Sequence, residues 1–247
     1  MPGRGDLQIY RDSAALAHAL ADLFVSVGRM AMAERGAFYV ALSGGETPRA
    51  AYELLAGDEF RNELSWSDVF IYFGDERCVP PDDDQSNYRM AKQAFIDAVG
   101  IPHANVHRIH GEIEPGHAAN QYASLLRTEL GNAPSFDLVL LGLGKDGHTA
   151  SLFPGTPPDT DDEAFVRAVY APTQMMWRIT FTPKVINLGR TVAFEVAGSA
   201  KAEILAAVYD GPINPVKYPA QSVHPLSGRL IWLVDELAAE MLKSEGR

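Results

Sequence analysis

Asp146 and His148 are the side chains of this sequence best placed for acid–base chemistry, because they stand two residues apart in one glycine-rich stretch. That stretch reads L-G-L-G-K-D-G-H-T at 141–149. Histidine exchanges protons near neutral pH, and a neighbouring carboxylate can orient its ring. A single histidine could instead only cap the turn or a helix. The loop that it shares with Asp146 and three glycines favours His148 as a catalytic base.

A second set of residues is suited to binding an anion. A Gly-Gly turn between a strand and a helix exposes backbone N–H groups beside the positive end of the helix dipole. Thr47 is expected to cap that helix and Pro48 to begin it. The turn could instead be a purely structural connection, but we interpret it, together with nearby cations, as a phosphate site. The predicted binding residues are Ser43, Gly44, Gly45, Thr47, Arg49, Arg178 and Lys201.

Asp75 and Arg77 follow a predicted strand in the segment F-G-D-E-R at 73–77. Arg77 stands close to where the glycine turns should meet, and its guanidinium could stabilise a negatively charged oxygen during a reaction. It could also pair with Asp75 or Glu76, and the two roles are compatible. Asp75 is a further candidate for proton transfer.

Other chemistries have little support in the sequence. No serine lies in G-x-S-x-G and no histidine is near Cys78, which argues against a covalent acyl-enzyme. The spacing C-x-x-C is absent, and the acidic run 82–84 lacks the spacing of a calcium loop. The glycines at 142, 144 and 147 match the dinucleotide pattern G-x-G-x-x-G. Pro154 prevents the long helix that this pattern requires, and the later acids Asp161, Asp162 and Glu163 lie in a Pro- and Asp-rich loop.

Composition limits the partners that the protein can have. The 247 residues carry a formal net charge of −11, which argues against nucleic acid or an anionic membrane as a partner. An anionic small molecule would need a local cluster of cations. The single cysteine, Cys78, excludes an intrachain disulfide framework and suggests a reducing, cytoplasmic environment. We see neither a signal pattern at the N-terminus nor an apolar run of membrane-spanning length.

Apolar runs and helical periodicities alternate along the chain. Strands are expected at 7–10, 37–42, 69–73, 106–109, 138–141, 165–170, 178–181, 191–196 and 230–234. Helices are expected from 12 or 13 to 36 and at 48–55, 87–99, 116–130, 183–188, 201–208 and 235–243, with Ser86 and Ser199 as caps. This order indicates an α/β fold, a doubly wound, mainly parallel sheet flanked by helices, in a single domain over 1–247. The glycine turns follow strands, so they should gather at one edge of the sheet, where ligands bind.

Several stretches, in this order along the chain, resemble the 6-phosphogluconolactonase family. They are S-G-G-E-T-P at 43–48, F-G-D-E-R-C-V-P at 73–80, D-Q-S-N at 84–87, L-G-L-G-K-D-G-H-T-A-S-L-F-P-G at 141–155, W-R-I-T-F-T at 177–182 and V-A-G-S-A-K at 196–201. The family is similar in fold to glucosamine-6-phosphate deaminases and ribose-5-phosphate isomerases. Glu46 stands where the family often has serine, and 174–177 lacks the usual proline-rich lead-in.

The resemblance implies hydrolysis of 6-phospho-D-glucono-1,5-lactone to 6-phosphogluconate, the second step of the oxidative pentose phosphate pathway, without a metal or organic cofactor. The loop 43–49, Arg178 and Lys201 are then expected to hold the phosphate, and His148 to activate a water. Arg77 or a backbone N–H would stabilise the oxyanion. The expected partner is the small-molecule phosphosugar lactone, with the protein a monomer or weak homo-oligomer. Two alternatives stay open: a sugar-phosphate isomerase or deaminase with Asp75 as base, and a non-catalytic sugar-phosphate sensor.

Overall fold

Six short apolar strands pair in parallel as the main sheet of the computed structural model, which describes residues 5–155 and 164–243. The predicted acidic loop, with Asp161, Asp162 and Glu163, lies outside the described residues. The predicted α/β fold with a parallel sheet flanked by helices is confirmed. In spatial order the strands are β1 (Asp6–Tyr10), β9 (Arg229–Asp235), β8 (Thr191–Val196), β5 (Leu138–Gly142), β2 (Phe38–Leu42) and β3 (Val69–Phe73).

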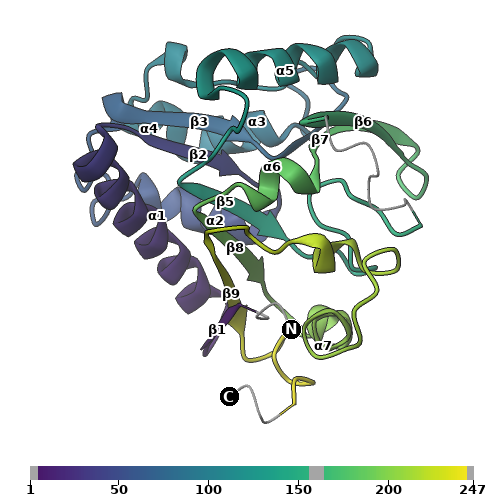
Figure 1. Cartoon of the computed structure of the whole chain (residues 1–247). Helices are drawn as coiled ribbons and strands as arrows, with labels where there is room; N and C mark the ends of the chain where they lie inside the picture. The colour runs from purple at the N-terminus through teal and green to yellow at the C-terminus, as the bar shows by residue number, and fades with distance from the viewer. Residues whose placement is uncertain (1–4, 156–163, 244–247) are drawn as a thin grey trace.

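Helices cover both faces of this sheet (Figure 1). The long helix α1 begins after Asp12, whose carboxylate accepts a hydrogen bond from the Ala15 N–H at 2.8 Å, and it ends at Gly36 in the left-handed conformation, as predicted. On one face lie α1 (Ser13–Arg35) and α2 (Glu46–Leu55). On the other side lie α5 (Pro115–Leu130), α6 (Pro183–Asn187) and α7 (Ala202–Tyr209).

Two predicted elements are wrong and one is modified. Residues 106–109 contribute only an isolated bridge from Val106 to Ile71, and 235–243 form turns in place of a helix. Ser86 caps the predicted helix 87–99, but that helix contains a π-helical middle. It consists of α3 (Asn87–Ala91), η2 (Lys92–Ile96) and α4 (Asp97–Val99). Short 3₁₀ turns are η1 (Trp66–Asp68), η3 (His103–Asn105), η4 (Ser199–Lys201) and η5 (Pro219–Ser222).

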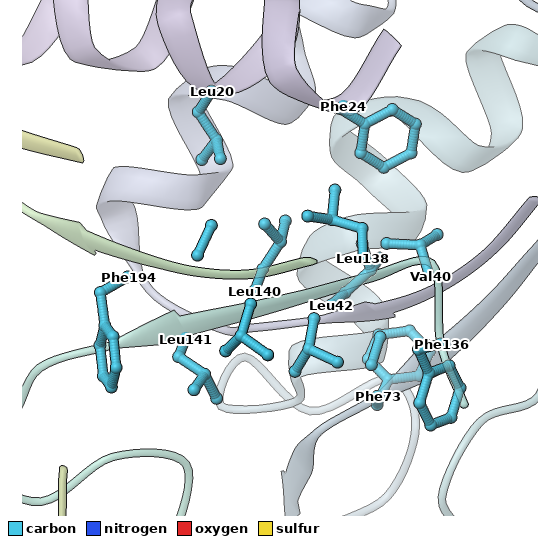
Figure 2. Close-up of a cluster of buried hydrophobic side chains, with 14 of the residues drawn as sticks. Leu20, Phe24, Val40, Leu42, Phe73, Phe136, Leu138, Leu140, Leu141 and Phe194 are labelled. Carbon is cyan, nitrogen blue, oxygen red and sulfur yellow. The ribbon is translucent and has the colours of Figure 1, made fainter. Parts of the chain in front are cut away.

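Part of the hydrophobic core lies between α1 and the central strands, and the same core also includes side chains of α5 and β7. Figure 2 shows Leu20 and Phe24 pointing from α1 toward the sheet, above side chains from β2 and β5. By length and composition alone α1 could cross a membrane, so the expectation of no apolar run that long was wrong. Its apolar residues at helical spacing are buried against the strands, as in a core helix.

A second, three-stranded antiparallel sheet was not predicted as such. Its order is β4 (Asp75–Arg77), β7 (Met176–Phe181) and β6 (Val166–Ala171). β4 follows β3 after the single residue Gly74, and it pairs with β7 so that Arg77 lies opposite Arg178. The predicted strands 165–170 and 178–181 are therefore real, but they belong to this sheet, and the pairing of β7 with β4 places Arg178 beside Arg77.

We expect Asp137, just before β5, to stabilise the fold strongly. Its buried carboxylate accepts hydrogen bonds from the Tyr39 N–H at 2.9 Å and from Arg35 Nη2 at 2.8 Å. Asp137→Ala leaves both donors without this partner and should lower the free energy of unfolding by about 2 kcal/mol. Urea denaturation measures the change. The control Asp58→Ala, at an exposed position, should change it by less than about 0.5 kcal/mol; equal effects of the two variants would contradict this assignment.

Candidate active site

The turns after β2 and β5 form the walls of a cavity of about 470 Å³ at the carboxyl ends of the parallel strands. β2 pairs directly with β5, although β3 lies between them in sequence. The strand order therefore reverses direction here, which is the position where open α/β sheets bind ligands. Of the predicted site residues, those that line this cavity are Ser43, Gly44, Asp75, Arg77, Asp146, His148, Arg178 and Lys201.

Asp146 and His148 form the predicted pair. His148 Nδ1 lies 2.5 Å from Asp146 Oδ1, and the same oxygen accepts the His148 backbone N–H at 3.1 Å. Because a carboxylate can only accept, Nδ1 carries the hydrogen and Nε2 keeps a free lone pair. Burial alone would raise the pKa of the Asp146 carboxyl, but the hydrogen bonds and charge of His148 lower it. The pair is thus arranged to present Nε2 as a proton acceptor.

Gly144 makes room for the His148 ring. A Cβ built on Gly144 would lie 2.0 Å from His148 Nδ1, so a larger residue cannot coexist with this ring position. The turn is closed by hydrogen bonds from the Gly144 N–H to the His148 carbonyl and from the Gly147 N–H to the Gly144 carbonyl. Gly147 has φ 85°, a conformation that favours glycine. No helix follows in 143–155, which agrees with the argument against dinucleotide binding.

Asp75 is buried in a polar cluster at the junction of the two sheets. Its carboxylate accepts a hydrogen bond from Ser151 Oγ at 2.6 Å and one from Asn87 Nδ2 at 3.2 Å, and Arg178 Nη1 lies 3.5 Å away. Burial lowers the pKa of Arg178, and Asp75 acts against this shift. The guanidinium beside Asp75 is therefore that of Arg178, whereas the sequence suggested Arg77.

Arg77 does not form the ion pair with Asp75 or Glu76 that the sequence left open. Its Nη1 donates to the Gln85 carbonyl at 2.6 Å, and its buried Nε has no partner among the described residues. The Glu76 carboxylate instead accepts the backbone N–H groups of Arg77, Asn87 and Tyr88, each at 2.8 Å. Burial raises the pKa of Glu76, and these hydrogen bonds oppose the shift. Glu76 thus fixes the start of α3 against β4, a function that the sequence did not reveal.

The loop at 43–49 differs from the prediction in its cap. α2 begins at Glu46 after Gly45, which has φ 119° and makes no side-chain cap, so Thr47 is not the N-cap. Only glycine adopts such a φ readily, and this allows the chain to enter the helix sooner. Thr47 does not line the cavity, whereas Gly45 and Arg49 line a neighbouring cavity of about 310 Å³. Arg49 Nε donates to Glu53 Oε1 at 3.0 Å.

Lys201 approaches the site from the end of β8. Ser199 does not cap a helix; 199–201 form a 3₁₀ turn and Lys201 precedes α7. Lys201 Nζ donates to the Leu143 carbonyl at 2.5 Å, at the entrance to the turn that carries His148. Burial lowers its pKa, Lys145 lowers it further, and Asp146 raises it. An anion in the cavity would favour the charged form of this lysine.

Within 5–155 and 164–243, no three side chains of His, Cys, Asp or Glu are grouped as a metal site would require. The donors that line the cavity are instead guanidinium, ammonium and N–H groups, which suit an anionic ligand.

Cys78 is half-buried, and burial raises the pKa of its thiol to about 11, which disfavours a thiolate nucleophile.

Comparison with known proteins gives this cavity a family context. Residues 11–232 match the family described as glucosamine-6-phosphate isomerases/6-phosphogluconolactonase. The chain belongs to this family. It is 43% identical over 218 residues to a 6-phosphogluconolactonase of Synechocystis sp., a match that covers 86% of this chain and 88% of that protein. The resemblance seen in the sequence is thus confirmed.

Solved structures of the same family have the same fold. The 6-phosphogluconolactonase from Trypanosoma cruzi superposes with a TM-score of 0.87 at 28% identity, covering 98% of each chain. A monomeric glucosamine-6-phosphate deaminase superposes with a TM-score of 0.80 at 20% identity, covering 96% of this chain and 99% of that one. At 20% identity, the deaminase supports the fold alone.

The contact between Gly144 and His148 can be tested without a substrate. Gly144→Ala should force the ring away from Asp146, so the side-chain ¹H–¹⁵N NMR signals of His148 should lose the pattern of a hydrogen on Nδ1. Gly142→Ala is the matched control, since a Cβ there meets no atom within 4 Å. Its His148 signals should stay close to those of the wild type. Unchanged His148 signals in Gly144→Ala would contradict the geometry.

Proposed function

We propose that this protein hydrolyses 6-phospho-D-glucono-1,5-lactone to 6-phospho-D-gluconate, the reaction for which its relative in Synechocystis sp. is named. The observation that carries the proposal is the oriented Asp146–His148 pair in a cavity that is also lined by Arg178 and Lys201. The pair supplies a base, and the cations supply recognition of a phosphate. A phosphosugar lactone has both a carbonyl that water can attack and a distant phosphate.

In the proposed reaction, His148 Nε2 takes a proton from a water molecule as the water oxygen attacks the lactone carbonyl carbon. The resulting tetrahedral oxyanion collapses, the bond from this carbon to the ring oxygen breaks, and the protonated imidazole returns the proton to that oxygen. Asp146 holds the ring and stabilises the imidazolium. A lactone is a reactive ester, so general-base help of about a hundred- to ten-thousandfold and good positioning are sufficient.

Arg77 is the proposed oxyanion donor. Its side chain lines the cavity, and its guanidinium carries a fixed positive charge that can stabilise an oxyanion there. Asp75 has a supporting role in this scheme, because its carboxylate is already engaged by Ser151, Asn87 and Arg178. These contacts suit a role of Asp75 as the acceptor that holds Arg178 in place. They suit less well the role that the isomerase alternative would require, in which Asp75 is a base that takes protons from a sugar.

The phosphate is placed between Ser43-Gly44, the start of α2, Arg178 and Lys201. The N-terminus of α2 has no side-chain cap, so its N–H groups and dipole are available for an anion. Arg49 and Thr47 receive no phosphate contact in this proposal: Arg49 is engaged by Glu53 and neither residue lines the main cavity. Glu46 is exposed at the first position of α2, outside that cavity.

His148→Ala should lower kcat for lactone hydrolysis by about a hundredfold or more while the protein stays folded, because the proton acceptor is lost. Hydrolysis is followed as acid release and corrected for spontaneous ring opening. The control His110→Ala changes a histidine that does not line the cavity, and it should keep the wild-type rate. A folded His148→Ala protein within a few-fold of wild type would exclude His148 as the base. Formation of fructose 6-phosphate from glucosamine 6-phosphate would favour the deaminase alternative instead.

The proposed contacts to the phosphate predict strong selectivity for the phosphorylated lactone. Charge-assisted hydrogen bonds to phosphate contribute about 1.5–3 kcal/mol each, so several should favour the phosphorylated lactone over glucono-1,5-lactone by at least about a thousandfold in kcat/KM. Lys201→Ala should reduce this ratio mainly through KM for the phosphorylated substrate. Near-equal kcat/KM for the two lactones would show that loop 43–49 is only a structural turn.

A further inference from the structure

Glu195 is a buried acid that the proposed reaction does not use. It lies in β8 opposite Gly142 of β5, at the carboxyl end of the main sheet, and it is 3% exposed. One carboxyl oxygen is hydrogen-bonded to Ser43 Oγ, and the other has no hydrogen-bond partner among the described residues. Ser43 itself lines the main cavity. A titratable group therefore stands directly behind a residue that faces the proposed phosphate.

Within the described ranges, the surroundings of Glu195 offer no positive charge to balance a carboxylate. The residues in register with it are Gly142 of β5 and Leu233 of β9. From α2, Tyr52 is the titratable neighbour, and its hydroxyl donates to the Ser43 carbonyl at 3.1 Å. The residues that α1 buries are all apolar or glycine.

The nearest charged groups at the ends of the neighbouring strands are engaged elsewhere. Lys201 donates to the Leu143 carbonyl, and Asp235 accepts the Gly198 N–H at 2.9 Å. Hydrogen bonds from Ser43 and from backbone groups of Leu141 and Glu195 favour the carboxylate, but burial without a cation makes its charge costly, so the neutral acid is the form that this site favours. Burial accordingly raises the pKa of Glu195 to about 8.

We infer that Glu195 is a positioning residue for anion binding: its neutral acid orients the Ser43 hydroxyl toward the anion, and its ionised form weakens that binding. This inference rests on the proposed function of the cavity. A neutral acid can donate its O–H to Ser43 Oγ, which leaves the Ser43 hydrogen free to donate to a phosphate. An ionised acid can only accept, so Ser43 must then donate to Glu195 and turn its lone pairs toward the cavity. Ionisation also adds a negative charge behind the anion.

The test uses 6-phosphogluconate, the stable product, as the ligand in calorimetric titrations from pH 7 to pH 9. The proteins are the wild type, Glu195→Gln and the control Glu240→Gln, which makes the same chemical change at an exposed position. The amide introduced by Glu195→Gln keeps a donor for Ser43 and cannot ionise. The ratio of the wild-type to the Glu195→Gln dissociation constant should rise from about one at pH 7 to roughly five to ten at pH 9. Lys201 and the ligand titrate alike in all three proteins, so the ratio isolates Glu195.

A ligand-free measurement keeps the inference separate from the proposed function. The ¹³C signal of the Glu195 carboxyl, assigned by its absence from Glu195→Gln, should titrate with a midpoint near pH 8. A midpoint at the ordinary value of about 4.3, or a constant ratio of dissociation constants, would overturn the inference. Failure of all three proteins to bind 6-phosphogluconate would count against the proposed function. The same pH series with inorganic phosphate, which probes the anion site without the sugar, would then decide the role of Glu195.

Discussion

The parallel pairing of β2 with β5 is the constraint on which the site depends. Val40 lies opposite Leu138 and Ala41 opposite Val139, so both strands end at the same edge of the sheet. The chain leaves β2 into the Ser43-Gly44 turn and leaves β5 into the turn that carries His148. Because these two turns must be neighbours, one cavity receives both a helix N-terminus and the imidazole that we propose as the base. Neither turn could perform the proposed reaction alone.

The parts of the site that depend on local sequence could be predicted. Asp146 and His148 belong to one short glycine-rich turn, and their contact is set within three residues. The order of strands and helices likewise follows from periodicity. The Asp75–Arg178 contact joins residues 103 positions apart through a three-residue strand, and nothing local marks so short an element as a strand. The sequence therefore offered only Arg77, as one alternative, for the guanidinium beside Asp75.

Some other errors have specific physical causes. Thr47 and Ser199 have good capping side chains, but Gly45 and Gly198 adopt positive φ values that start the helical turns differently. Residues 235–243 have a helical pattern. The Asp235 carboxylate accepts the N–H groups of Ala238 and Gly198, and the first of these is a contact typical of a helix N-cap. The segment nevertheless forms turns, and the structure offers no explanation for this. Glu195 was visible as a single charge in an apolar strand, but its contact with Ser43 required the sheet order.

The environments of the buried acids are compatible with the proposed binding of an anion by a protein of charge −11. Glu76 is surrounded by N–H donors, Asp75 is matched by Arg178, and burial raises the pKa of Glu195 to about 8, which disfavours an unbalanced negative charge beside the cavity. We expect the phosphate and the lactone carbonyl of the substrate to occupy opposite parts of this cavity. A crystal structure with 6-phosphogluconate tests this expectation most directly. The phosphate should contact Gly44, Arg178 or Lys201, and the carboxylate should lie within hydrogen-bond distance of His148 Nε2. A phosphate at His148, or the ligand in the cavity beside Arg49, would contradict the account.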